Sequence, residues 1–275
     1  PYAASLPDDD FLVPASLARC VAFLEQHPDY TTAHGDSALL MLQRSGPHGS
    51  VEAVWPHYAN EECGRTAAQR LQSFLGPNYF GTMFSIHRTA QLRTLYNRVA
   101  PVLLSDKMFM EILVGCNSVT QGKVKLLNGL YLIRHQHDQR YGAADLFDWV
   151  TGPTWSTVYE HFRDVLVEEL KRQDRLGEEE AREVVKRSFW LWLANRFMSR
   201  WRRREGLERR RLRQVRALAC RVPGLKPAWR MAQSLLPGRD GRLSLQALLR
   251  PGSPYHTDFL PIYQALTDGR GLRSS

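Results

Sequence analysis

Residues 6–14 have the sequence LPDDDFLVP, and the patterns on either side of this stretch decide which fold class the chain is expected to have. Tyr2–Leu6 is typical of a short strand, and Ala15–Gln26 has its apolar residues at the spacing of one helix face. Pro14 suits the first turn of that helix, because the N–H that proline lacks would have no partner there. A strand that leads through a polar turn into a helix is typical of an α/β protein.

Strand and helix patterns continue to alternate up to residue 144. The expected strands are Tyr30–His34, Ala38–Leu42, Gly81–His87, Lys123–Leu127 and Leu130–Arg134, and the expected helices are Thr66–Leu75, Thr89–Val99 and Asp106–Ser118, with Asp106 as an N-cap. Gly35-Asp36 predicts a turn, Asn128-Gly129 predicts a hairpin, and Arg44–Asn60 is expected to be an irregular loop. The alternation predicts an α/β layer architecture.

The composition is that of an ordinary globular protein. The 275 residues are 43% hydrophobic and 24% charged, which excludes collagen, a coiled coil or a disordered chain as the main character. No apolar run approaches the ~20 residues of a membrane span. Four scattered cysteines form no CxxC pair, so free thiols in a reducing compartment are expected, and with them a cytoplasmic location.

After residue 144 the pattern becomes helical. Thr154–Asp174 and Val184–Arg204 are expected helices, and most aromatic residues of the second should pack on Val158, Phe162 and Val165. The change of pattern predicts two parts: residues 1–144, which are α/β, and residues 145–275, which form a helical and basic extension.

The positive charge lies entirely in the second part. Residues 1–144 contain 12 Lys and Arg against 12 Asp and Glu, whereas residues 145–275 contain 25 against 16. Arg200–Arg216 alone contains nine arginines and two glutamates. Such a run is either a solvated helix face or a surface for phosphates, anionic lipid or nucleic acid. Trp192 and Trp201 and the lack of a base-reading motif favour peripheral binding to the anionic inner face of a membrane over nucleic acid.

The three aspartates are the candidate for chemistry. Burying Asp8, Asp9 and Asp10 together is unfavourable unless a cation compensates them, and Mg²⁺ or Mn²⁺ held by carboxylates and substrate phosphates suits the arrangement. The alternative is a solvated acidic turn ahead of the helix.

The string from Leu6 to Pro14 resembles the metal-binding motif of GT-A-fold, family-2-like glycosyltransferases of bacteria. In that group a proline follows four residues after the last aspartate, as Pro14 follows Asp10. The resemblance implies that Asp9 binds the metal and that Asp8 contacts the metal or the donor, with Asp10 also at the donor site. Pro7 stands where the first aspartate of the common pattern would be, which is a departure from the family.

A second part of the resemblance lies downstream. Glu111, about a dozen residues before Gly122-Lys123, has the place of the general base of the family, although an exposed helix glutamate is the alternative reading. The resemblance further implies that His87 and Arg88 border the acceptor and that His135 reaches the metal or the diphosphate.

The resemblance therefore implies a partial GT-A-like, Rossmann-like mixed sheet with a C-terminal all-helical extension. It implies a metal-dependent, inverting glycosyltransferase of bacterial envelope or surface glycan synthesis, which moves a sugar from a nucleotide-sugar donor to a glycan or lipid-linked acceptor hydroxyl. Enzymes of this group have a nucleotide-binding half before the aspartates, so this chain is expected to be a C-terminal part that is inactive alone.

Two other functions stay open. Clustered aspartates with Mg²⁺ also serve phosphohydrolases and nucleotidyltransferases, although no nucleophile or second acidic pair accompanies them here. The other alternative is a non-enzymatic module that binds a membrane surface or nucleic acid through Arg200–Arg216.

Overall fold

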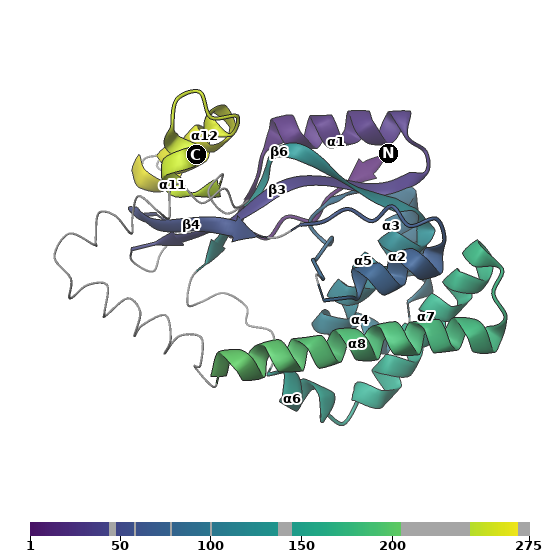
Figure 1. Ribbon diagram of the computed structural model, residues 1–275. Coiled ribbons are helices and arrows are strands. Elements are labelled where there is room, and N and C mark those ends of the chain that lie inside the picture. The colour runs from purple at the N-terminus through teal and green to yellow at the C-terminus, as the bar shows by residue number, and fades with distance from the viewer. Residues whose placement is uncertain are drawn as a thin grey trace, which may run out of the picture.

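A computed structural model describes residues 1–43, 48–57, 59–77, 79–99, 101–136, 145–204 and 243–268, with the side chains of residues 200–204 excepted. These residues form a mixed α/β fold around one curled sheet (Figure 1). Its strands are β1 (Tyr2–Ala3), β2 (Asp10–Leu12), β3 (Tyr30–Leu42), β4 (Val51–His57), β5 (Ile86–Arg88) and β6 (Lys123–Gln136). The order is β1-β5-β3-β6-β2, and β4 pairs with β3 beyond the point where β5 does.

The centre of the sheet is the parallel pair of β3 and β6, and all other pairs are antiparallel. Both strands run through the dipeptides that the sequence predicts to be turns. Gly35 permits a close approach of the two backbones, because a Cβ there would lie 2.6 Å from the Gly129 carbonyl oxygen. Gly129 has a φ of +121°, which glycine adopts without strain. The predicted turn and hairpin are therefore wrong: the glycines serve an irregularity within continuous strands, where the register shifts.

Two other predicted segments differ from the structure. The expected loop at Arg44–Asn60 contains strand β4, whose Pro56 is tolerated because β4 pairs with β3 alone among the described strands. The expected strand Gly81–His87 is a strand only from Ile86, where it pairs with β1 and β3.

Helices cover both faces of the sheet (Figure 1). On one face lie α1 (Pro14–Gln26), α11 (Leu245–Leu249) and α12 (His256–Asp268); on the other lie α2 (Ala67–Phe74), α3 (Thr89–Arg98), α4 (Pro101–Leu104) and α5 (Lys107–Gln121). Beyond α5 lies a further layer with α6 (Leu146–Val150), α7 (Trp155–Asp174) and α8 (Glu178–Arg204). The predicted N-cap is confirmed: Asp106 accepts from the Phe109 amide at 2.9 Å and also from the Trp149 indole N–H at 2.9 Å.

The main core joins both parts of the chain. Phe189 and Trp192 of α8 are buried with Val158 and Phe162 of α7, which confirms the predicted packing of these aromatic residues. The same cluster includes Phe109 and Leu113 of α5. A second cluster places α11 and α12 against β3, β4 and β6. Residues from before and after residue 145 therefore share each of these two cores.

The contact of α5 with α2 generates a stability prediction. A Cβ on Gly115 would lie 2.4 Å from the ring of the buried Phe74. We expect Gly115→Ala to lower the free energy of unfolding by about 1–3 kcal/mol, since overpacking outweighs the better helix propensity of alanine. Urea unfolding measures the effect. Gly177→Ala is the control, because nothing lies within 4 Å of a Cβ there, and equal stability of the two variants would contradict the prediction.

Candidate functional site

The aspartates do not end a strand as the sequence predicts. β1 stops at Ala3, and Asp8 and Asp9 lie in a turn that is closed by the Asp10 amide and the Pro7 carbonyl at 3.4 Å. Asp10 then begins β2, which pairs with β6. Asp8 is exposed and Asp9 is half-buried, so the turn presents two carboxylates at the surface.

Asp10 supports the fold of the turn. Its buried carboxylate accepts from Arg134 Nε at 3.0 Å and from the His135 amide at 3.0 Å. Burial raises the pKa of Asp10 above its ordinary value, although the Arg134 guanidinium opposes this shift. These bonds tie the turn to β6. Because the Asp10 carboxylate is already paired inside the protein, the expected contact with the donor would require this pair to break.

A small cavity is lined by neighbours of Arg134 and of Glu111, although its described lining residues include neither Glu111 itself nor any of the three aspartates. Arg134, the partner of Asp10, stacks on the Phe84 ring with its guanidinium carbon 4.7 Å from the ring centre. Phe84 and Gly81 both line a cavity of about 20 Å³. Glu111 lies near Gly81, since its Oε1 is 3.4 Å from where a Cβ of Gly81 would be. The Glu111 side chain is exposed, so it is open to a ligand or to solvent.

His87 lies inside the protein and does not border this cavity. Its ring is 3% exposed, with Nε2 2.8 Å from the Thr82 carbonyl and Nδ1 3.2 Å from the hydroxyls of Thr32 and Ser118. This bonding fits a neutral ring that donates from Nε2. Burial lowers the pKa of His87 from 6.5 to about 4. His87 could contact a sugar acceptor, as the resemblance implies, only if the structure around this buried ring opened.

Arg88 also has structural partners. Its guanidinium donates to the carbonyls of Leu24, at 2.6 Å, and His27, at 3.2 Å, and so satisfies the C-terminal end of α1. It also donates to the Tyr30 carbonyl at 3.0 Å and the Tyr2 hydroxyl at 3.1 Å. Sequence reasoning placed Arg88 at the acceptor, whereas the structure uses it to join α1, β1 and β3.

The expected metal ligands are not brought together as one set. His135 follows Arg134 in β6, so strand alternation directs its side chain to the opposite face of the sheet. Within the ranges described above, no three His, Cys, Asp or Glu side chains lie close enough to hold one metal ion. Asp8 and Asp9 nevertheless have the hard oxygen ligands that suit Mg²⁺ or Mn²⁺, provided that substrate phosphates supply the others.

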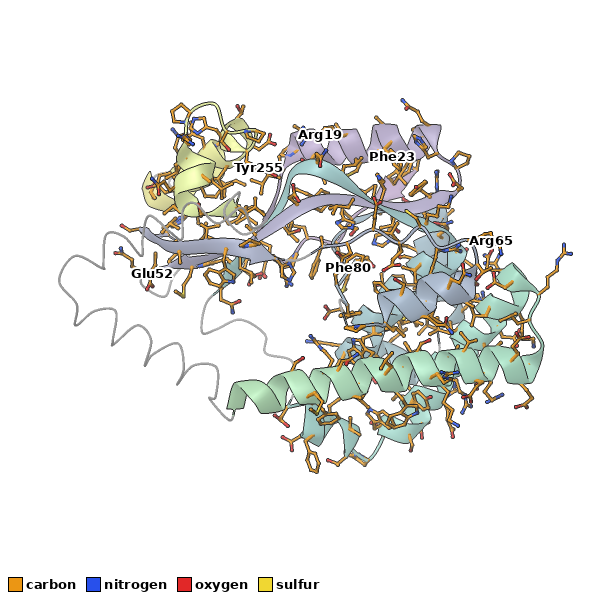
Figure 2. All side chains as sticks on the ribbon, viewed as in Figure 1. Arg19, Phe23, Glu52, Arg65, Phe80 and Tyr255 are labelled. Atoms are coloured by element: carbon orange, nitrogen blue, oxygen red, sulfur yellow. The ribbon has the colours of Figure 1, made fainter. Side chains whose placement is uncertain are left out.

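A cleft with a mostly polar lining lies next to the small cavity, and we call it the polar cleft. Its volume is about 680 Å³, and it shares Ser37, His57 and Ala59 with the small cavity. Among its other lining residues are polar side chains from several elements: Asp36, Asn60, Glu61, Glu62, Gln72, Ser73, Asn128 and Tyr255. Tyr255, which directly precedes α12, donates its hydroxyl to Asp36 at 2.9 Å. Figure 2 labels Tyr255 beside α12.

Sequence reasoning missed these cleft residues. Asp36 was assigned to a turn, and His57 and Asn60 to a loop. The alternation of Val51, Ala53 and Trp55 is the signal that could have shown β4, but Pro56 obscured it. Glu62 had no local signal, because its burial comes from an isolated backbone bridge to Val124. Burial raises the pKa of the Glu62 carboxyl.

Comparison with known proteins assigns no family: no family model, no curated protein and no solved structure matches this chain. Of the helices that the structure describes, none is both long and apolar enough to cross a membrane.

The buried ring of His87 generates a prediction of pH dependence. Its folded pKa of about 4 lies below 6.5, so the unfolded chain binds more protons and stability falls as the pH drops through this window. We expect the free energy of unfolding to be about 2 kcal/mol lower at pH 5 than at pH 7 on account of His87. Urea unfolding of wild type and His87→Gln at both pH values measures the difference. His161→Gln, an exposed site on α7, is the control, and an unchanged pH dependence in His87→Gln would refute the assignment.

Proposed function

We propose that this chain provides the cation-binding turn and the general base of a GT-A-like, metal-dependent glycosyltransferase. The observation that carries the proposal is the position of the small cavity. One of its lining residues, Gly81, lies against Glu111, and another, Phe84, lies against Arg134, which holds Asp10 at the aspartate turn. Sugar transfer with inversion needs a carboxylate base and a bound cation near one substrate, and the common neighbourhood of Glu111 and the aspartate turn supports this proposal.

In the proposed reaction, Glu111 and the aspartate turn have different tasks. The oxygen of an acceptor hydroxyl attacks the anomeric carbon, and the bond from that carbon to the diphosphate breaks, with its electron pair leaving on the diphosphate. Glu111 takes the proton of the hydroxyl as a general base. A cation held by Asp8 and Asp9 would, when bound, neutralise the charge that develops on the leaving diphosphate.

The remaining residues of the turn hold these groups in place. Arg134 and the His135 amide fix Asp10, so the two preceding carboxylates project from a fixed backbone rather than from a free loop. Pro14 starts α1 directly after β2 and limits movement on the other side of the turn. A preorganised turn lowers the entropic cost of binding a cation together with a diphosphate.

The proposal predicts that substitutions in the aspartate turn and at Glu111 impair different steps of the reaction. The complete gene product is incubated with Mn²⁺ and a panel of nucleotide sugars, and the released nucleoside diphosphate is measured. We expect Asp9→Asn to reduce release at least 100-fold through loss of the cation, and Glu111→Gln to reduce transfer while donor binding is retained. The control is Asp29→Asn, which breaks only an exposed ion pair with Lys123. Equal release by wild type and Asp9→Asn, or release that EDTA does not affect, would refute the proposal.

A second candidate function is binding to an anionic membrane surface. Helix α8 exposes Trp190, which is 43% exposed, together with Met198. Lys186 and Arg187 are exposed on the same helix, and residues 184–204 contain seven Lys and Arg but no Asp or Glu. Apolar and basic side chains together suit an interface with anionic lipid. Residues 205–216, the larger part of the arginine run, lie outside the described residues, and α8 provides the remaining support.

Vesicle sedimentation tests this candidate. We expect the protein to bind phosphatidylcholine vesicles that contain phosphatidylglycerol at least tenfold better than pure phosphatidylcholine, and salt to weaken this binding. Arg187→Glu and Trp190→Ser should each lower it, whereas Tyr96→Ser should not, because Tyr96 is an equally exposed aromatic residue on α3. Equal binding to both kinds of vesicle, or binding to neither, would refute the contact of α8 with anionic lipid.

A further inference from the structure

The polar cleft has the dimensions of a ligand site and lies beside the proposed reaction centre. Its volume of about 680 Å³ is within the range of small-molecule sites in proteins. It is bounded by β3 and β4, by α2 and by Tyr255 ahead of α12, and Leu191 of α8 also lines it. The residues that it shares with the small cavity make the two hollows neighbours.

The chemistry of the lining selects the class of ligand. Three carboxylates, those of Asp36, Glu61 and Glu62, line the cleft, and none of its described lining residues is Lys or Arg. Glu61 is paired with Lys125 at 2.6 Å, but none of the described residues that line the cleft is Lys or Arg, so a diphosphate or another anion would face carboxylates without a basic partner of its own. A ligand with many hydroxyl donors would instead find carboxylate acceptors, since an ionised carboxylate only accepts hydrogen bonds.

Neutral polar groups add hydrogen bonds of both kinds. Asn60, Gln72 and Asn128 are among the lining residues, and a side-chain amide can both donate and accept. Pro56, Pro77 and Leu126 provide apolar surface between the polar groups. A sugar ring has the matching surface, with hydroxyl groups around its edge and C–H groups on its faces.

One wall of the cleft is held in place before any ligand binds. Asp36 accepts from the Tyr255 hydroxyl at 2.9 Å and from the Gly129 amide at 3.4 Å. Glu62 is 6% exposed, and its backbone forms two hydrogen bonds with Val124, of 3.0 and 2.9 Å. Fixed acceptors of this kind reduce the entropy that a ligand loses on binding.

We propose that the polar cleft binds the uncharged saccharide portion of a glycan, with Asp36, Glu61 and the amides of Asn60 and Gln72 as hydrogen-bonding groups. That this saccharide is the acceptor rests on the proposed function. Binding itself does not, because it needs neither a nucleotide nor a metal.

An array of neutral, sialylated and sulfated oligosaccharides tests the proposal, with the labelled protein in EDTA and without nucleotide. We expect binding to neutral glycans and none to the anionic ones. For a neutral oligosaccharide that binds, saturation-transfer NMR then gives Kd for the wild type and for Asn60→Ala and Gln72→Ala, which we expect to bind at least tenfold more weakly. Asn97→Ala, an exposed asparagine on α3, is the matched control.

Each other result overturns the proposal. Absence of binding to every neutral glycan, or a preference for the anionic ones, would show that the cleft does not select uncharged saccharides. An unchanged Kd in both cleft variants would place the glycan elsewhere. Donor turnover is measured with Mn²⁺ and a nucleotide sugar, whereas glycan binding is measured in EDTA without nucleotide. A failure of the proposed function is therefore distinguishable from a failure of glycan binding.

Discussion

The parallel pairing of β3 with β6 is the constraint on which the rest of the structure depends. Parallel neighbours cannot be joined by a tight turn, so β4, β5 and α2 to α5 all lie in the connection between these two strands. The pair also carries the walls of both hollows: Asp36 and Ser37 come from β3, and Leu126 and Asn128 come from β6. Farther along β6, Arg134 holds Asp10. One strand pair thus fixes the polar cleft and the aspartate turn relative to each other.

Burial separates the polar residues that support the fold from those that are open to a ligand. Arg70 shows the first kind: it is buried and donates to the carbonyls of Val119 and Thr120 at the end of α5. His87 and Arg88 have the same character, because their polar atoms are used by backbone carbonyls and neighbouring hydroxyls. Asp8 and Glu111 remain exposed. Residue type alone gives no such separation, since it depends on partners that lie far away in the sequence.

The C-terminal part contributes to the site as well as to the core. Leu191 of α8 and Tyr255 before α12 line the polar cleft from two separate parts of the extension. The helices α11 and α12 cover β4 on one face of the sheet, whereas α7 and α8 lie beyond α5 on the other (Figure 1). The extension therefore bounds the hollow that we propose to hold the saccharide, and it presents its exposed basic and apolar helix beside that hollow.

The sequence by itself determined the α/β class, the start of α1 at Pro14, the capping of α5 by Asp106 and the aromatic packing of α8. Each of these follows from a pattern within one or two turns of chain, where local geometry dominates. Only the tertiary structure decided that Gly35 and Gly129 lie within strands, because their conformations serve a long-range approach of two backbones. It also decided the pairing of Asp10 and the burial of His87 and Glu62. Those depend on which distant groups exclude water from a side chain, and no local spacing encodes that.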